Sequence, residues 1–405
     1  MNTPIRTATG MNTTPSLIQN QLTNWLLRRT PTSGVRRVAT LSAALASDVG
    51  NVREDNQDRA AVIRGRDQQG REYVLVAVAD GIGGMNDGAS CAAMAIAAFV
   101  AAVDRLAQTV GINDRPDDWL REGAHVANEV VFSKFHASGG STLVALLVRP
   151  GLQPYWLSVG DSRVYSMDDK TLIQTSIDDT IAGQLGKNPE DSSEQSRLLQ
   201  FVGMGPDLEP HVAIFDAESI DAVILTTDGV HFLSPSPGWM SLIIRHSPDP
   251  GVCVKRLIDL AKWCGGPDNA TVAMITLPVD AQTGTKLDYP CLEVWDAYGE
   301  LQFISPPSST ARWAENARPT ITPCSSVLVP STASIASSIE PVVDASPNSP
   351  SPDAPRPRRG KVARKPKKSS AERSLGLDKV SEGSEMPQLH MEFPTKSSEQ
   401  EPPKS

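Results

Sequence analysis

Cysteines are few in this 405-residue sequence, and their pattern excludes two classes of protein. They are an odd number at wide spacing, without a Cys-x-x-Cys pair: Cys91, Cys253, Cys264, Cys291 and Cys324. This pattern excludes a disulfide-dense secreted scaffold and a cysteine-based zinc site. It fits the reducing cytosol, so we expect a cytoplasmic protein.

Long hydrophobic runs are also missing. The longest, Cys91–Val103, has 13 residues, which is too short to cross a bilayer and is typical of a buried helix. The beginning of the sequence lacks a signal-peptide pattern, because its apolar stretch around Leu26 is short and ends in two arginines. We therefore expect no transmembrane segment.

Aromatic residues make up only 5% of the chain, whereas prolines number 32, which indicates that part of the chain does not pack. Residues 281–405 hold 17 of these prolines together with 20 serines. We expect a disordered tail over 309–405 that carries a basic cluster, 355–370, with eight basic residues. Before it, within 281–308, two alternating runs flank Asp-Ala-Tyr-Gly and predict a β-hairpin at Cys291–Ile304.

Positive charge is scarce in the middle of the chain. Residues 1–34 carry three basic and no acidic residues, and we expect them to be flexible, with one short helix near Leu17–Leu27. Residues 35–280 carry 20 basic and 32 acidic residues, a net charge of −12. This acidic balance argues against a nucleic-acid-binding fold and fits either an ordinary acidic surface or carboxylates that surround cations.

Residues 35–280 have the pattern of one α+β domain. Strand-like runs joined by short turns favour antiparallel pairing, and helices that fall in blocks favour stacked layers over a doubly wound sheet. The expected helices are Ala89–Leu106, Asp117–Phe135 and Val252–Cys264. The expected strands are Ala60–Ile63, Tyr73–Ala79, Thr142–Val148, Tyr155–Val159, Arg163–Ser166, Thr171–Thr175, Val212–Phe215, Ala222–Thr227 and Ala270–Leu277.

Acidic residues follow or open several of these strands. Asp80 and Asp228 each end an apolar run and precede glycine, Asp161 follows another run, and Asp268 opens the last strand. Carboxylates at strand ends can converge at one rim of a sheet, and glycine allows a backbone carbonyl to join them. Oxygen ligands of this kind suit Mg²⁺ or Mn²⁺. Each motif alone is more often a turn, but together they indicate a metal site.

The motifs also resemble, in identity, order and approximate spacing, those of a known family. They are R-x-x-N-Q-D from Arg53, D-G-x-G-G from Asp80, G-G-S-T from Gly139, V-G-D-S-R from Val159, T-D-G from Thr227 and D-N-A-T from Asp268. Over Ala43–Leu277 the chain is similar to bacterial metal-dependent serine/threonine protein phosphatases of the PPM type. The resemblance implies a four-layer sandwich of two antiparallel β-sheets flanked by helices, with metal ions at one end.

The resemblance further implies a centre of two Mn²⁺ or Mg²⁺ ions, with a third ion bound more weakly. Asp80 would bridge the two ions, and the Gly81 carbonyl would bind one of them. Asp228 and Asp268 would hold the other ion, and Asp161 would bind the third.

The remaining site residues are also implied by the resemblance. Arg53 would grip the substrate phosphate, Asp58 would support the cluster directly or through water, and Gln57 and Asn269 would assist. The cations would lower the pKa of a shared water for attack on phosphorus, and Arg53 would offset the phosphoryl charge through a forked pair of bonds.

The sequence departs from the family pattern at five positions. Gln57 replaces a glutamate, Ile82 a histidine, Ala89 a glutamate, Asp179 the histidine of an Asp-His pair, and Phe232 an acidic residue. Two functions therefore remain open. One is an active phosphoprotein phosphatase, and the other is a catalytically weak, phosphatase-like module that binds phosphoproteins.

The expected partners follow from these two functions and from the tail. They are phosphoprotein substrates and a cognate Ser/Thr kinase, and we expect the protein to be a monomer. The basic cluster would bind an acidic partner, nucleic acid or anionic lipid, or it would remain a solvated linker.

Overall fold

The structure is a computed structural model that describes residues 15–82, 87–109, 115–168, 171–186, 197–215, 220–232, 238–279 and 291–304. All of these residues belong to one unit, Met1–Ile321. The predicted tail, 309–405, and its basic cluster, 355–370, lie outside the described residues.

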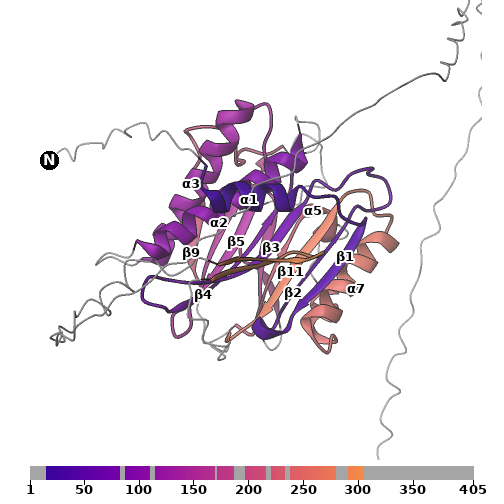
Figure 1. Ribbon diagram of the computed structural model, residues 1–405. Helices are drawn as coiled ribbons and strands as arrows, with labels where there is room; N and C mark the ends of the chain where they lie inside the picture. Colours follow the sequence, from indigo (N-terminus) through magenta and orange to yellow (C-terminus); the bar gives the residue numbers. More distant parts are fainter. Residues whose placement is uncertain are drawn as a thin grey trace, which may run out of the picture. The chain divides into compact units, whose positions relative to one another are not determined.

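Two antiparallel sheets form the centre of this unit (Figure 1). The six-stranded sheet runs, from edge to edge, β1 (Ser33–Val38), β2 (Ala43–Asp48), β11 (Ala270–Thr276), β10 (Ala222–Thr226), β7 (Arg163–Met167) and β8 (Leu172–Gln174). The seven-stranded sheet runs β13 (Glu300–Ile304), β12 (Cys291–Trp295), β3 (Arg59–Arg66), β4 (Glu72–Ala79), β5 (Leu143–Val148), β6 (Tyr155–Val159) and β9 (His211–Ile214).

Helices cover the outer face of each sheet. The seven-stranded sheet packs against α1 (Leu17–Leu26), α2 (Gly88–Gln108) and α3 (Pro116–Phe135), and the six-stranded sheet packs against α5 (Asp228–His231), α6 (Gly238–Arg245) and α7 (Pro250–Trp263). A third apolar cluster fills the space between the two sheets. This four-layer α+β sandwich confirms the expected fold.

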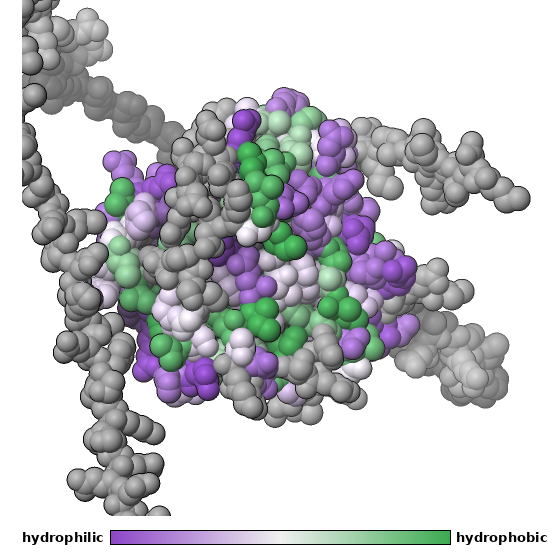
Figure 2. All heavy atoms as spheres, turned by 180° about the vertical axis from the view of Figure 1, so that it is seen from behind, coloured by the Kyte–Doolittle hydropathy of each residue, from purple (hydrophilic) through white to green (hydrophobic). Residues whose placement is uncertain are grey.

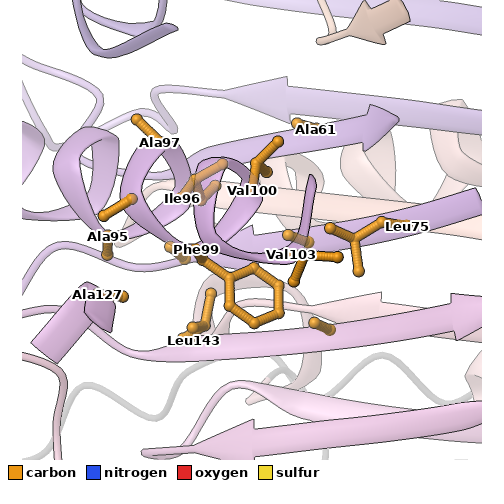
Figure 3. Packing of buried hydrophobic residues seen from close by; sticks show 14 of the residues in the cluster. Ala61, Leu75, Ala95, Ile96, Ala97, Phe99, Val100, Val103, Ala127 and Leu143 are labelled. Atoms are coloured by element: carbon orange, nitrogen blue, oxygen red, sulfur yellow. The ribbon is translucent and has the colours of Figure 1, made fainter. Parts of the chain in front are cut away.

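Helix α2 packs closely against both the seven-stranded sheet and α3. Phe99 and Val103 of α2 lie among Leu75 of β4 and Leu143 of β5 (Figure 3). Gly123 of α3 allows the close approach of the two helices, because a Cβ there would lie 2.8 Å from the Phe99 ring. By length and composition alone α2 could cross a membrane. Here most of its residues are buried within the domain, as predicted for the apolar run.

Apolar residues also remain at the surface, where they are scattered among polar ones. Figure 2 shows this interspersed pattern over the face opposite to that of Figure 1.

The prediction that residues 1–34 are flexible is wrong for the part that the structure describes. The predicted short helix is present as α1, which begins at the cap residue Ser16, and the side chains of Leu22 and Leu26 are buried against α2. β1 then begins at Ser33. The reason is that α1 covers apolar surface on α2, a contact that local composition does not reveal.

Leu22→Ala is expected to lower the free energy of unfolding by about 2–5 kcal/mol, because the side chain is fully buried and its loss leaves a cavity. Urea denaturation measures the change. Leu17→Ala, in the same helix but 72% exposed, is the control and should have little effect. Equal stabilities for the two variants would mean that α1 does not belong to the core.

The predicted hairpin is present, and it is an edge of the seven-stranded sheet rather than a separate extension. β12 pairs with β13 and also with β3. In its turn, Asp296 accepts hydrogen bonds from the backbone N–H groups of Tyr298 and Gly299. Asp296 also forms a salt bridge of 2.7 Å with Arg28, which follows α1. The hairpin and α1 therefore stabilise each other.

Candidate active site

One pocket of about 370 Å³ contains eight of the nine predicted site residues. These eight are Arg53, Gln57, Asp80, Gly81, Asp161, Asp228, Asp268 and Asn269. The ninth, Asp58, is buried beside the pocket, with 2% of its surface exposed. The other lining residues are Ile82, Thr142, Arg197, Leu198 and Phe201.

Strand pairing places the carboxylates together. Asp58 and Asp80 flank the paired ends of β3 and β4, where Arg59 is opposite Ala79. Asp228 and Asp268 flank the paired ends of β10 and β11 in the other sheet, where Thr226 is opposite Val272. The two sheets therefore present acidic residues at the same end of the sandwich.

The backbone of Asp80 is held by the start of β5. Its N–H donates to the Thr142 hydroxyl at 2.9 Å, and its carbonyl accepts from the Thr142 N–H at 2.9 Å and the Ser141 hydroxyl at 2.8 Å. The Thr142 hydroxyl also shares a hydrogen bond with Ser162, beside Asp161. In the sequence, the motif Gly-Gly-Ser-Thr is the feature that points to Ser141 and Thr142.

A buried hydrogen-bond network positions Asp58. Its Oδ2 accepts from the Thr227 hydroxyl at 2.8 Å, and Thr227 in turn accepts from the Thr271 N–H. The Thr271 hydroxyl shares a hydrogen bond with Ser47 of β2. The Asp58 Oδ1 is buried and has no hydrogen-bond partner within the described part of the chain. One oxygen of this carboxylate is thus fixed and the other is left for a ligand.

Arg53 lies on a loop that is fastened to the end of α7. Its Nη2 donates to Asp268 Oδ2 at 2.6 Å, and 44% of its side chain is exposed. The Asn51 side chain donates to the carbonyls of Lys262 and Gly265, and its N–H donates to Gly266. These bonds hold the guanidinium at the mouth of the pocket, and no sequence motif pointed to Asn51.

Burial and mutual repulsion raise the pKa values of the carboxyl groups. The pKa of Asp228 rises to about 6, that of Asp58 to about 7 and that of Asp161 to about 8, in each case chiefly through burial. The pKa of Asp80 lies well above its usual range because burial and the surrounding negative charges oppose its ionisation. A cation in the pocket would relieve this repulsion.

The donor set fits divalent cations. Oδ1 of Asp228 is buried without a hydrogen-bond partner among the described residues, as is Oδ1 of Asp58. A side chain at Gly81 would collide with the backbone of Gly88, so the backbones of these two residues lie in close contact. No three His, Cys, Asp or Glu side chains in the described ranges are grouped tightly enough to hold an ion alone. Mg²⁺ takes one or two protein carboxylates and keeps several waters, so the unpartnered oxygens of Asp58 and Asp228 are suitable donors for it.

The described departures from the family pattern have different structural contexts. Gln57 and Ile82 line the pocket, so an amide and an apolar side chain stand where a carboxylate and an imidazole are usual. Phe232 supplies no carboxylate, and its ring lies 5.5 Å from the Arg163 guanidinium carbon. Of the motif that begins at Asp80, residues 83 and 84 lie outside the described part of the chain.

The fold and the pocket define a class of protein, namely a layered α+β sandwich with a carboxylate-lined pocket and an arginine at the mouth of that pocket. Comparison with known proteins identifies the family within that class. Residues 51–250 match the family model described as protein phosphatase 2C. The domain that contains these residues belongs to this family, the PPM-type serine/threonine protein phosphatases.

Individual relatives support this membership. The serine/threonine phosphatase stp of Listeria welshimeri is 26% identical over 249 residues, which cover 58% of this chain and 95% of that protein. The serine/threonine protein phosphatase PstP of Mycobacterium tuberculosis is 30% identical over 249 residues, which cover 59% of this chain but 45% of that protein. The crystal structure of Stp1 from Staphylococcus aureus has the same fold, with a TM-score of 0.51, 19% identity, and coverage of 59% of this chain and 95% of that one.

Proposed function

We propose that this protein hydrolyses phosphoserine and phosphothreonine in proteins, with two Mn²⁺ or Mg²⁺ ions and a third ion bound more weakly. The observation that carries the proposal is the convergence of Arg53 and four pocket carboxylates, Asp80, Asp161, Asp228 and Asp268, on one cavity. Such a cavity offers an anion contact and cation ligands side by side, as phosphoryl transfer to water requires.

The side chains have separate roles in this proposal. Asp80, Asp228, Asp268 and the Gly81 carbonyl hold the two principal ions, and Asp161 contributes to the weaker third site. When bound, the ions supply an activated water and neutralise the charge of the phosphoryl group.

The remaining residues support these ligands and bind the substrate. Asp58, fixed by Thr227, supports the ion cluster from its buried position, and Gln57 and Asn269 assist it. Asn269 accepts from the Gln57 N–H at 2.8 Å and donates to the carbonyls of Val49 and Asp55, which keeps the Arg53 loop in register. Arg53 then orients the substrate phosphate at the mouth of the pocket.

A phosphothreonine peptide assay tests the proposal. Release of phosphate is expected with millimolar Mn²⁺ and is expected to stop when a chelator is added, because the carboxylates alone activate no water. The same assay without enzyme and with Mn²⁺ is the control. If the folded protein binds the peptide but releases no phosphate at any Mn²⁺ or Mg²⁺ concentration, the weak interaction module is the correct function and the enzyme proposal fails.

We further propose the cellular setting of this activity. The protein would work as a monomer in the cytoplasm and reverse the action of a Ser/Thr kinase on shared substrates. The wide spacing of the cysteines, without a Cys-x-x-Cys pair, supports a reducing compartment. The basic cluster, 355–370, would tether the enzyme to an acidic partner, nucleic acid or anionic lipid.

A further inference from the structure

A buried carboxylate outside the proposed ion ligands joins three segments of the chain. Asp179 is 1% exposed. Its Oδ2 accepts from the Gly160 N–H at 2.9 Å, and its Oδ1 accepts from Nε2 of His211 at 2.8 Å and from Nε2 of Gln200 at 3.2 Å. These donors come from the loop before β7, from β9 and from the segment 197–202.

The first of these contacts fixes the loop that carries Asp161. The Asp179 N–H donates to the Gly160 carbonyl at 2.9 Å, so both the N–H and the carbonyl of Gly160 are hydrogen-bonded to Asp179. Gly160 has a φ of +96°, and a Cβ there would lie 2.8 Å from the Thr142 methyl group. Thr142 also holds the backbone of Asp80. The loop therefore lies between Asp179 and Thr142, and Thr142 is the residue that supports Asp80.

The other contacts fix one wall of the pocket. The Leu199 N–H donates to the Asp179 carbonyl at 2.7 Å, and Thr180 and Leu198 form an isolated β-bridge. Leu198 lines the pocket, as do two residues near it in the chain, Arg197 and Phe201. The side chain and backbone of one residue thus connect this wall to the Asp161 loop.

The environment of Asp179 suits a carboxylate, although a histidine is usual at this position in the family. An ionised carboxylate only accepts hydrogen bonds, and here three donors surround it. His211, which is half-exposed on β9, supplies one of them. The imidazole beside Asp179 therefore comes from β9.

We propose that Asp179, with His211 as its partner, is a positioning residue that aligns the wall formed by Arg197, Leu198 and Phe201 with the Asp161 loop. The proposal rests on the proposed phosphatase function, because the aligned wall would receive the residues that flank the phosphate in a protein substrate. Loss of the contact would loosen that wall while leaving the ligands of the two principal ions in place.

Asp179→Ala is expected to raise KM for a phosphothreonine peptide about tenfold, because substrate contacts on the wall are lost. The value of kcat for p-nitrophenyl phosphate, which has no flanking residues, is expected to change less than about threefold. Asp179→Asn, which keeps an oxygen for His211 and Gln200, is expected to recover most of the peptide KM. His211→Ala should raise KM in the same direction but less, with His246→Ala, an exposed histidine, as its control.

Hydrogen exchange separates this inference from the function on which it depends. In Asp179→Ala the Gly160 amide and the amides of 197–202 are expected to exchange at least about tenfold faster, whether or not the protein is an active phosphatase. Faster exchange in a protein that hydrolyses nothing would retain the positioning role and reject the proposed function. Unchanged exchange, or a peptide KM in Asp179→Ala equal to that of the wild type, would overturn the positioning role. If Asp179→Ala does not fold, His211→Ala supplies the same readouts.

Discussion

Asp80→Asn is expected to lower kcat/KM for a phosphothreonine peptide by about a thousandfold or more. Asp80 is the central carboxylate of the pocket, and an amide carries no charge for two shared cations, so both would bind weakly or out of place. Steady-state kinetics at several Mn²⁺ concentrations measure the loss. Excess Mn²⁺ should recover little of it, because the position of the ions changes as well as their affinity.

The stability of Asp80→Asn distinguishes damage to the site from damage to the fold. Burial and neighbouring carboxylates already disfavour a charge at this position, so the metal-free variant should unfold at the same temperature as the wild type or higher. Asp104→Asn is the matched control, since Asp104 is a partly buried carboxylate that also has a raised pKa but accepts from the Tyr73 hydroxyl, outside the pocket. Near-normal kinetics in Asp80→Asn would refute the assigned role.

Saturating Mn²⁺ is expected to raise the melting temperature of the wild-type protein by about 5–10 °C. An ion at about 100 times its dissociation constant stabilises the folded state by about 2.7 kcal/mol, which corresponds to about 2–4 °C per kcal/mol in a domain of this size. Scanning calorimetry with and without chelator measures the shift. Asp228→Asn should lose most of it, and Asp104→Asn should keep it.

The metal-dependent shift in melting temperature should also grow with pH. In the metal-free protein the folded-state pKa values of Asp228, Asp58 and Asp161 are raised to about 6, 7 and 8, above the unfolded value of about 4. The folded state therefore binds more protons than the unfolded state. The contribution of these groups to the free energy of unfolding is complete below about pH 4 and declines as the pH rises towards 8. Bound cations offset that decline. A metal-free melting temperature that rises between pH 5 and 8 would contradict this account.

Much of the fold could be predicted because its strands are local patterns. The nine strands predicted within residues 35–280 and the four predicted helices are present, with ends that differ by a few residues. β1 and β2 were missed. β2 has the sequence Ala-Ala-Leu-Ala-Ser-Asp, which has no strand preference of its own, and it forms because β1 and β11 pair with it on either side. Its burial on both faces is a property of the sandwich.

The site was predictable in its residues but not in its supports. Motif identity and order pointed to Arg53, Asp80 and the other carboxylates, since each lies in a recognisable short segment. Asn51 had no such signal, because it acts through a partner that is distant in sequence, Lys262. Thr227 lies in the T-D-G motif, but its hydrogen bond to the distant Asp58 could not be predicted from that motif. For Asp179 the sequence signal was misleading, because this residue stood out only as a departure from the family pattern.

By itself, the sequence determined which chemical groups are available, namely several carboxylates beside glycines, one arginine ahead of them, and scarce cysteines without metal-binding spacing. It also determined most of the strands, though not β1 and β2, because alternation and turn residues are local properties. Only the tertiary structure decided that eight of these residues share one pocket, that α1 belongs to the core, and that Asp179 joins the pocket wall to the Asp161 loop. The physical reason is that burial, repulsion between carboxylates and hydrogen bonds between distant strands depend on three-dimensional proximity.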